Sequence, residues 1–494
     1  MPRVVNSDDQ HSPNDDAYDG GEPGASGHLR GNLGIPSIVL MVVAASAPLS
    51  TIGGNVPIGM ALGDTAGMPF AFLVAGLIFL LFALSFVAMA KYVTDSGAFY
   101  AYIEKGLGRL AGSGAATLAL PAYMATLLGV SAYGGVILGN LIERMGGPSV
   151  PWWLLTGLVV VVVAWLGYRD IELSAKVLGV FLVSEVAILA VLDLVIVAQG
   201  GKHGITGDSF TPDGLAGGFG IALLYALWGF VGVEATAVFR DEAKDPDRTV
   251  PRATYWAVGI VAIFYAFSCW ALVEGNGGND AIAIAAKDPD NFMVNTARDY
   301  LGILGQDLTN ALWFVSVFAC ALSFHNITSR YAFILGKSGV FPRRFGQVDD
   351  RFGAPSNASV AVSIASGVIL AVLAVVGLDP VVEIFGPLGG LGILWLSILW
   401  LLTSISIVLF FSRRGGAGRT VVVAVLASLA LAAGLVLVVS NLTLVVGGST
   451  SLAVIFGVLP VVVFLTGMLL SRRAIARSAQ AGSGSDTAVA AVDR

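Results

Sequence analysis

Long apolar runs recur along this chain of 494 residues, and they constrain its fold more than any other feature. Each run is long enough to cross the ~30 Å hydrocarbon layer of a bilayer. The runs lie near residues 35–60, 68–90, 112–142, 151–168, 174–198, 216–238, 252–274, 308–335, 357–378, 383–412, 419–440 and 447–471. Because they are continuously apolar rather than alternating, helices are favoured over a β-barrel. The sequence predicts an all-α polytopic membrane protein with 12 transmembrane helices.

Composition excludes several other classes of protein. Only 12% of the residues are charged and 56% are hydrophobic, against about 25% charged in soluble domains. A soluble enzyme is therefore excluded, and a net charge of −6 provides no basic face for nucleic acid. The two cysteines, Cys269 and Cys320, lie in apolar runs and the four histidines are scattered, so no disulfide framework, metal site or cofactor is predicted. The bilayer itself is the expected environment.

The ends of the chain and its basic residues predict the topology. Residues 1–33 form an acidic tail, expected to be disordered, and the Ser/Ala/Gly-rich end, 472–494, is expected to be a second, unstructured tail. Twelve spans would place both tails on one side of the membrane. That side would then hold all Lys and Arg residues except Arg144, Lys202, Lys287 and Arg298. The positive-inside rule makes both termini cytoplasmic in a multi-pass protein of the plasma membrane.

Two of the runs contain helix breakers. Residues 45–57 include Pro48, Pro57 and a Gly-Gly pair, and residues 227–234 contain two glycines before Glu234. Breaks at membrane depth are tolerated where the backbone lines a cavity or is buried in protein. Glycines that only allow close helix packing are the alternative interpretation. Breaks in the first and sixth spans together favour two five-helix repeats, as in many secondary transporters.

The predicted domain organisation follows from the apolar runs and the two breaks. One membrane domain covers 34–471, with a first repeat of about 34–200, a second of about 213–412, and two further helices in 419–471. The two breaks predict a binding site for a small molecule near the bilayer centre.

The broken helices supply most of the candidate binding residues. The amides of Gly53, Gly54 and Asn55 are expected to begin an outer half-helix and attract a carboxylate. Freed carbonyls around 46–50 and 228–231 could accept an ammonium, so a zwitterion would need no charged side chain, whereas a polyamine would need a carboxylate. The candidate substrate-binding residues are Ser46, Ala47, Ser50, Thr51, Gly53, Gly54, Asn55, Trp228, Gly229, Phe230, Val231, Gly232 and Tyr123, with Tyr133 a weaker candidate.

Three motifs resemble the amino acid–polyamine–organocation superfamily. Residues 228–234, Trp-Gly-Phe-Val-Gly-Val-Glu, precede an Arg- and Pro-containing loop at 241–252. Ser-Gly-Ala-Phe-Tyr-Ala-Tyr at 96–102 and the stretch 329–342 match in order, so the resemblance covers about 34–471. It implies ten helices in two inverted repeats like those of LeuT, plus two peripheral helices, and alternating-access transport of amino acids or related amines. The sequence Ser46-Ala47-Pro48 departs from the Gly-rich break of many members and looks more like the polyamine-importing branch.

Buried carboxylates are the candidates for proton coupling. Glu185 lies near the position where proton-coupled members of the superfamily carry a lysine on the fifth helix, and Glu234 matches a glutamate linked to pH response in the antiporter branch. Glu234 is also the candidate carboxylate for direct contact with an amine substrate, and structural roles are the alternative for both glutamates. Asp193, eight residues after Glu185, is expected at the water interface, and His325 is expected to be a satisfied core histidine.

The leading functional prediction is therefore import of an amino acid or amine by proton symport, with Na⁺ as the alternative coupling ion. A substrate exchanger and a polyamine importer are the alternatives within transport. No phosphate-binding loop for ATP, ring of pore charges or catalytic cluster is visible, which disfavours an ATP-driven pump, a channel or a membrane enzyme.

Overall fold

The structure is a computed structural model that describes residues 34–93, 98–169, 175–211, 217–234, 243–349, 355–415, 418–446 and 448–492. Every regular element in these ranges is an α-helix or a short 3₁₀ or π-helical turn. The predicted acidic tail of residues 1–33 lies outside these ranges, and so do residues 235–242 of the loop after the sixth run. The all-α class is confirmed.

The helices follow the apolar runs in order. The first part of the chain forms α1 (Ile35–Ala45), α2 (Pro48–Ser50), η1 (Thr51–Asn55), α3 (Val56–Gly63), α4 (Met68–Ala90), α5 (Ala98–Leu107), α6 (Arg109–Arg144), α7 (Trp152–Tyr168) and α8 (Ala175–Gln199). The rest forms η2 (Asp208–Phe210), α9 (Phe219–Trp228), α11 (Pro246–Gly275), α12 (Asp280–Lys287), α13 (Phe292–Lys337), η4 (Arg343–Gly346), α14 (Ser356–Val376), η5 (Pro380–Phe385), α15 (Gly386–Arg413), α16 (Gly418–Ser440), α17 (Leu442–Val445) and α18 (Thr450–Val492). Most predicted runs fall on one of these helices. The first falls on the series from α1 to α3 and the tenth on η5 and α15, and the sixth falls on α9 and the segment that follows it to Glu234, with its last residues outside the described ranges.

Nine helices in the described ranges are long and apolar enough to cross a membrane. They are α4, α6, α8, α11, α13, α14, the continuous pair η5–α15, α16 and α18. The apolar helices α7 and α9 are shorter, and the first run is divided by a break. The protein is a multi-pass membrane protein, while the count of 12 crossings and the inverted repeat stay predictions.

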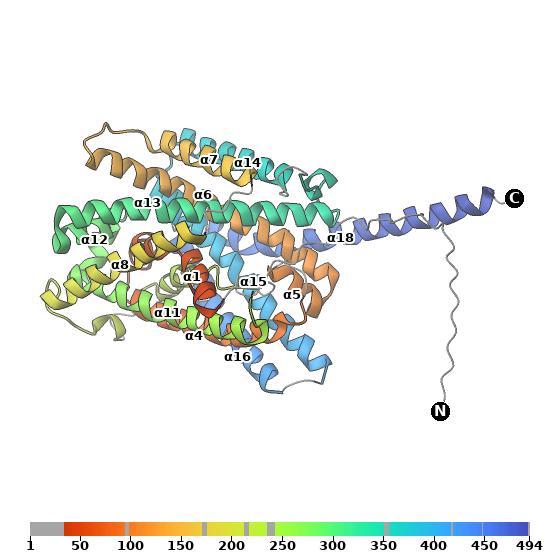
Figure 1. Ribbon diagram of the computed structural model, residues 1–494, viewed down its shortest axis with the longest axis horizontal. Helices are drawn as coiled ribbons and strands as arrows, with labels where there is room; N and C mark the ends of the chain where they lie inside the picture. Colours follow the sequence, from red (N-terminus) through yellow and green to blue (C-terminus); the bar gives the residue numbers. More distant parts are fainter. Residues whose placement is uncertain are drawn as a thin grey trace, which may run out of the picture.

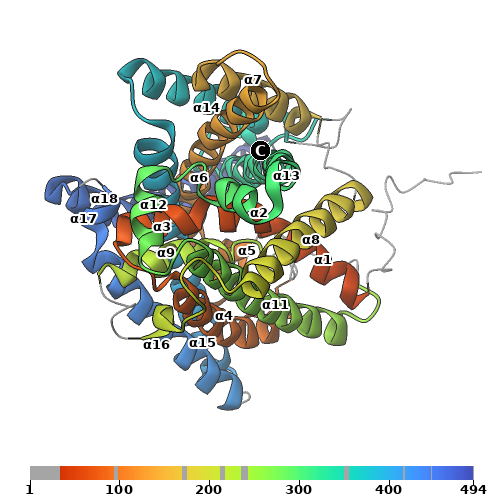
Figure 2. The ribbon, with the colours of Figure 1, turned by 90° about the vertical axis from the view of Figure 1, so that its left-hand side faces the viewer.

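The bundle packs around α6 and α13, which lie against each other. Figure 1 shows α13 running along most of the molecule, with α7 and α14 on one edge and α4, α11 and α16 toward the other. Seen end-on in Figure 2, the segments α1, α2 and α3 cross the middle of the bundle, and α9 lies beside α3. The divided first run is thereby placed where several helices can supply side chains to it.

The C-terminal helix corrects one prediction. The end of the chain was expected to be unstructured, but α18 continues to Val492 and extends away from the bundle (Figure 1). Alanines recur through residues 474–491, and alanine has the highest intrinsic helix propensity. These residues therefore prolong the preceding apolar helix.

Candidate functional site

The first helix breaks between α1 and α2. Ala47 has left-handed backbone angles, φ 46° and ψ 79°. Pro48 accounts for the end of α1, because a proline has no N–H and disfavours right-handed helical angles at the residue before it. The helix then restarts with Pro48 in its first turn, where proline is tolerated. The predicted break is confirmed, but it falls more than one turn before Gly53.

The backbone groups at this break have polar partners. The Ser46 carbonyl oxygen accepts hydrogen bonds from Thr51 Oγ1 at 2.8 Å and from the Tyr265 hydroxyl at 3.2 Å. The Tyr265 hydroxyl also lies 2.7 Å from Ser46 Oγ. On the other side of the break, the Leu49 N–H donates to a carboxylate oxygen of Glu185 at 3.3 Å. Buried backbone is tolerated here because α8 and α11 supply these partners.

Gly53 and Gly54 lie in the π-helical turn η1, which joins α2 to α3. Their amides are inside a helix, so the expected geometry, with these amides at the start of the outer half-helix, is wrong. The two glycines allow close packing instead. A Cβ atom on Gly53 would lie 2.6 Å from Met293 Cε and 2.7 Å from the Trp313 ring, and one on Gly54 would lie 3.0 Å from the Tyr133 ring.

The sixth run breaks after α9. The chain leaves the helix at Trp228 through i→i+3 turns, with the Val231 N–H donating to the Trp228 carbonyl at 3.1 Å. Gly232 has φ 104°, a conformation that is costly for residues with a side chain. Its N–H donates to Glu234 Oε2 at 2.9 Å. The second predicted break is confirmed.

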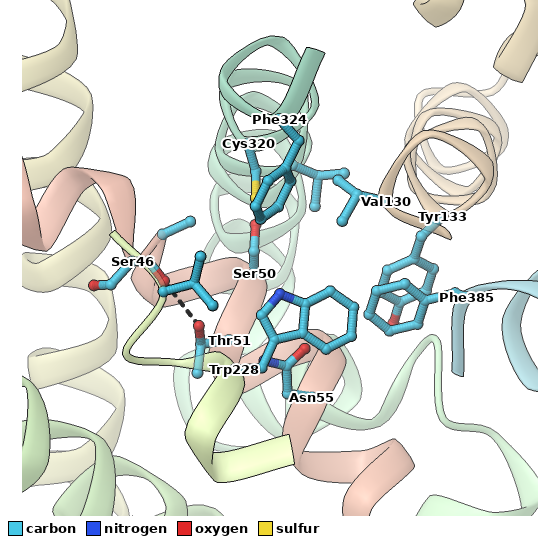
Figure 3. A pocket seen from close by; sticks show the side chains of 13 residues that line it. Ser46, Ser50, Thr51, Asn55, Val130, Tyr133, Trp228, Cys320, Phe324 and Phe385 are labelled. Carbon is cyan, nitrogen blue, oxygen red and sulfur yellow. Dashed lines mark hydrogen bonds between the residues drawn. The ribbon is translucent and has the colours of Figure 1, made fainter. Parts of the chain in front are cut away.

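A pocket lies where the two breaks meet (Figure 3). Its lining comes from the first break (Ser46, Ala47, Ser50, Thr51, Asn55), the sixth-run break (Trp228, Val231), α6 (Val130, Tyr133), α13 (Val317, Cys320, Phe324) and η5 (Phe385). About 380 Å³ is free of atoms, but only about 20 Å³ is open to the centre of a water molecule. The pocket is therefore narrow, and none of these lining residues carries a charge.

Aromatic rings form one side of the pocket. The Tyr133 and Phe385 rings stack with centroids 4.3 Å apart, and Trp228 lies 5.2 Å from Phe385. Trp313 meets Tyr133 edge-on at 5.4 Å. In Figure 3, the Trp228 indole lies between this group and the hydroxyl-bearing side chains of the first break. A ligand would thus meet hydroxyl and carbonyl groups on one side and aromatic faces on the other.

The pocket includes only part of the predicted set. Ser46, Ala47, Ser50, Thr51, Asn55, Trp228 and Val231 line it, whereas Gly53, Gly54, Gly229, Phe230, Gly232 and Tyr123 do not. Phe230 instead stacks on Phe79 at 4.9 Å, and a Cβ on Gly229 would lie 3.0 Å from Thr51. The lining residues Val317, Cys320 and Phe324 were missed, although their spacing of three and four indicates one helix face. Nothing in the sequence singled out Phe385.

Glu185, on α8, lies beside the pocket at the first break. Besides the Leu49 N–H, its carboxylate accepts a hydrogen bond from Ser316 Oγ on α13 at 2.9 Å. The Ser50 hydroxyl donates to Ser316 Oγ at 3.0 Å, and Ser50 lines the pocket. Glu185 is 5% exposed, and no described Lys or Arg pairs with it. It therefore caps the outer half-helix and connects to the pocket through two hydroxyl groups.

Glu234 is separated from the pocket by aromatic side chains. Its Oε1 accepts a hydrogen bond from the Tyr123 hydroxyl at 3.1 Å. The Tyr123 ring stacks on Tyr331 at 5.5 Å and lies 6.2 Å from Phe324, which lines the pocket. Glu234 and Tyr123 thus connect the sixth-run segment to α6 and α13 without lining the pocket.

Two further polar residues are also buried. Asp193 is fully buried and accepts a hydrogen bond from Ser268 of α11, so its predicted place at the water interface is wrong. The reason is that α11 packs against α8 along this face. His325 is buried with Nε2 3.0 Å from Ser359 Oγ, as expected of a core histidine.

A comparison with protein families identifies the chain. The family model described as "Amino acid permease" matches residues 33–475, which include both breaks and the pocket. The chain belongs to the amino acid permease family. The resemblance to the amino acid–polyamine–organocation superfamily is therefore confirmed.

Relatives of this permease differ in substrate and in mode of transport. It is 24% identical over 344 residues to the low-affinity putrescine importer PlaP of Escherichia coli (strain K12). The alignment covers 66% of this chain and 72% of the importer. It is 24% identical over 300 residues to the serine/threonine exchanger SteT of Bacillus subtilis (strain 168), covering 59% of this chain and 66% of the exchanger. It is 30% identical over 182 residues to the cadaverine/lysine antiporter of Escherichia coli (strain K12), covering 35% of this chain and 38% of the antiporter. These relatives support a secondary transporter for a small molecule.

A solved structure shares the fold of this permease. The crystal structure of the Eremococcus coleocola manganese transporter, in complex with an aromatic bis-isothiourea compound, matches with a TM-score of 0.56 and 13% identity. The match covers 91% of this chain and 98% of that transporter. At this identity, the likeness concerns the fold alone.

Proposed function

We propose that this permease imports an amino acid or related amine by proton-coupled symport and alternating access, with both termini in the cytoplasm. The observation that carries the proposal is the position of Glu185. Its carboxylate holds an amide of the broken first helix and connects through Ser316 to Ser50 in the pocket wall. A proton-binding group is thus linked to the substrate site by hydrogen bonds.

The pocket lining favours a substrate that carries one ammonium and one carboxylate. The faces of Trp228 and Tyr133 suit an ammonium through cation–π attraction. The side-chain amide of Asn55 can donate to a carboxylate, whereas the Ser50 and Thr51 hydroxyls already donate to Ser316 and to the Ser46 carbonyl. A polyamine carries several ammonium groups and no carboxylate, so it would place charges in a pocket whose lining has no acidic side chain. We therefore favour a small zwitterionic substrate over a polyamine.

The hydrogen bonds of Glu185 suggest how a proton and a substrate would be coupled. The N-terminus of a helix attracts an anion. At the N-terminus that begins with Pro48, the ionised Glu185 carboxylate takes this place by accepting from the Leu49 N–H. A substrate carboxylate approaching Ser50 would be repelled by that charge. Protonation of Glu185 removes the charge and leaves the helix N-terminus to the substrate. Proton and substrate binding would then favour each other equally, by thermodynamic linkage.

Exchange of one substrate for another is the second candidate, because SteT and the cadaverine/lysine protein are named as exchanger and antiporter. In an exchanger, Glu185 would be a structural cap for the first break, and transport would ignore the proton gradient.

Reconstitution into proteoliposomes tests the proposal. Labelled neutral amino acids, γ-aminobutyrate, putrescine and ethanolamine are offered with and without an inward proton gradient. We expect accumulation of a zwitterionic compound only with the gradient. Uptake that ignores the gradient but requires internal substrate would replace symport by exchange. Uptake of putrescine alone would contradict the inferred substrate class.

A further inference from the structure

A second cavity lies where four helices end, away from the substrate pocket. Its walls are the last turns of α4 and α15 and the first turns of α11 and α16. It offers about 590 Å³ to the centre of a water molecule, whereas about 10–15 Å³ measured in this way is enough for one water. The lining residues are Leu84, Val87, Ala88, Lys91, Tyr92, Asp247, Pro251, Tyr255, Phe411, Arg414 and Thr420. The cavity can therefore hold a ligand much larger than an ion.

Two cations of this cavity contact the same aromatic ring, that of Tyr92. Lys91 follows the last residue of α4 and Arg414 the last residue of α15. The Lys91 ammonium is 5.1 Å from the centre of the Tyr92 ring, and the Arg414 guanidinium is 4.8 Å from the centre of the same ring. Within the described ranges, neither cation forms an ion pair with a carboxylate. Asp247, the acidic residue of the lining, has a partner of its own.

An apolar track leads from these cations along the membrane-spanning part of α4. Leu73, Leu77, Leu80 and Leu84 follow one another at helical spacing and are 41%, 61%, 37% and 37% exposed. Figure 2 shows α4 near the edge of the bundle, with α11 on one side and α15 and α16 on the other. The cavity is thus charged at the membrane boundary and apolar toward the membrane interior.

We propose that this cavity binds one anionic phospholipid, with its phosphate at Lys91 and Arg414 and an acyl chain along Leu84, Leu80 and Leu77. Clustered cations at the cytoplasmic ends of membrane helices recognise anionic headgroups. The exposed leucines distinguish a lipid from a free phosphate, because a soluble phosphate would leave them unused. The site is separate from the substrate pocket and from proton coupling, but its cytoplasmic side rests on the proposed topology.

Native mass spectrometry of the full-length permease in detergent tests this inference, with phosphatidylglycerol as the probe. The double variant Lys91→Gln/Arg414→Gln should bind the lipid about thirtyfold more weakly, since each cation near an anionic lipid contributes a factor of about five. The control is Arg343→Gln/Arg344→Gln, which removes the same charge from exposed positions in η4. The control should bind as the unmodified protein does.

Three results would overturn the proposal. They are equal lipid binding by the double variant, an equal loss in the control, and displacement of the lipid by soluble glycerophosphate at the same concentration. The last result would indicate a site for free phosphate. If the double variant does not fold, Lys91→Gln and Arg414→Gln are measured singly, and each should weaken binding about fivefold.

Discussion

The two helix breaks beside the pocket are built by different means. The first lies at Pro48, which cannot continue the preceding helix and follows an alanine with left-handed angles, and the second turns at Gly232. Each has a buried glutamate. Glu185 comes from another helix and caps the break, whereas Glu234 belongs to the broken segment and bonds back to the N–H of Gly232.

The difference shows why the two carboxylates should not have the same role. Glu185 joins α8 to the first break and to α13 through groups that reach the pocket wall. Glu234 does not line the pocket, and its hydrogen bond with Tyr123 braces its own segment against α6. A carboxylate that shares its partners with the substrate site can couple a proton to binding, while one outside the pocket lining can affect only the movement of its segment.

The largest effect is expected for Glu185→Gln. The amide keeps the size of the side chain but cannot bind a proton, so accumulation driven by an inward proton gradient should fall more than tenfold. Counterflow of substrate should continue. Uptake and counterflow in proteoliposomes measure both, with the exposed Glu143→Gln as control. Normal gradient-driven accumulation in Glu185→Gln would remove this residue from the coupling mechanism.

The second prediction concerns the packing of the first break. Gly53→Ala should destabilise the protein by about 1–3 kcal/mol, because its Cβ would overlap Met293 and Trp313. Gly157→Ala on α7 is the control, since a Cβ there has no neighbour within 4 Å. Thermal unfolding in detergent compares the two. Equal stability of both variants would restore a binding role for the amide of Gly53.

Glu234→Gln should have a smaller effect, confined to rate. Because Glu234 does not line the pocket, we expect a few-fold lower maximal uptake rate and a KM within about twofold for amino acids and amines alike. Tyr123→Phe, which removes the hydroxyl that donates to Glu234, should act in the same direction. A rise in KM for amines alone would instead indicate direct contact between Glu234 and an ammonium group.

The smallest effect is expected for a carboxylate outside the spans. Asp290 lies between α12 and α13, where Asn140 of α6 donates to it at 3.3 Å. Burial and a hydrogen bond with Asp288 raise the pKa of Asp290 to about 6. The folded protein therefore binds this proton more tightly than the unfolded chain, and the contribution to stability is lost as pH rises through about 6.

The raised pKa of Asp290 predicts a measurable pH dependence of stability. The thermal stability of the unmodified protein should fall between pH 5 and pH 7, with Asp290 contributing about 1 kcal/mol of the change. Asp290→Asn should reduce that pH dependence, and the exposed Asp208→Asn should not. An unchanged pH dependence in Asp290→Asn would show that this carboxylate does not hold the proton.

The sequence was sufficient to predict the helical class and both breaks. Continuous apolar runs have one stable form in a membrane, and Pro48 and Gly232 interrupt helices for local reasons. The candidate site was predicted only in part. Ser46, Ser50 and Trp228 were found because they adjoin a break, and Glu185 because a carboxylate in an apolar run is rare.

The remaining features depend on contacts between distant segments. Phe385 reaches the pocket because η5 packs against α6, which no local pattern indicates. Gly53 and Gly54 were assigned to anion binding because a glycine pair also suits a helix start. Only the positions of Met293, Trp313 and Tyr133 show that these glycines make room for neighbouring side chains. Asp193 was misplaced because the sequence does not state how closely α11 covers α8.

The two π-helical turns have an evolutionary consequence. Each ends at a residue in the pocket wall, η1 at Asn55 and η5 at Phe385. A π turn holds one residue more than the α-helical turn it replaces, and one residue corresponds to about 100° of rotation around a helix. Loss of a single codon in either turn would straighten the helix and present a different side chain to the substrate. Two short stretches of the gene could thus change selectivity through length, with no substitution in the pocket.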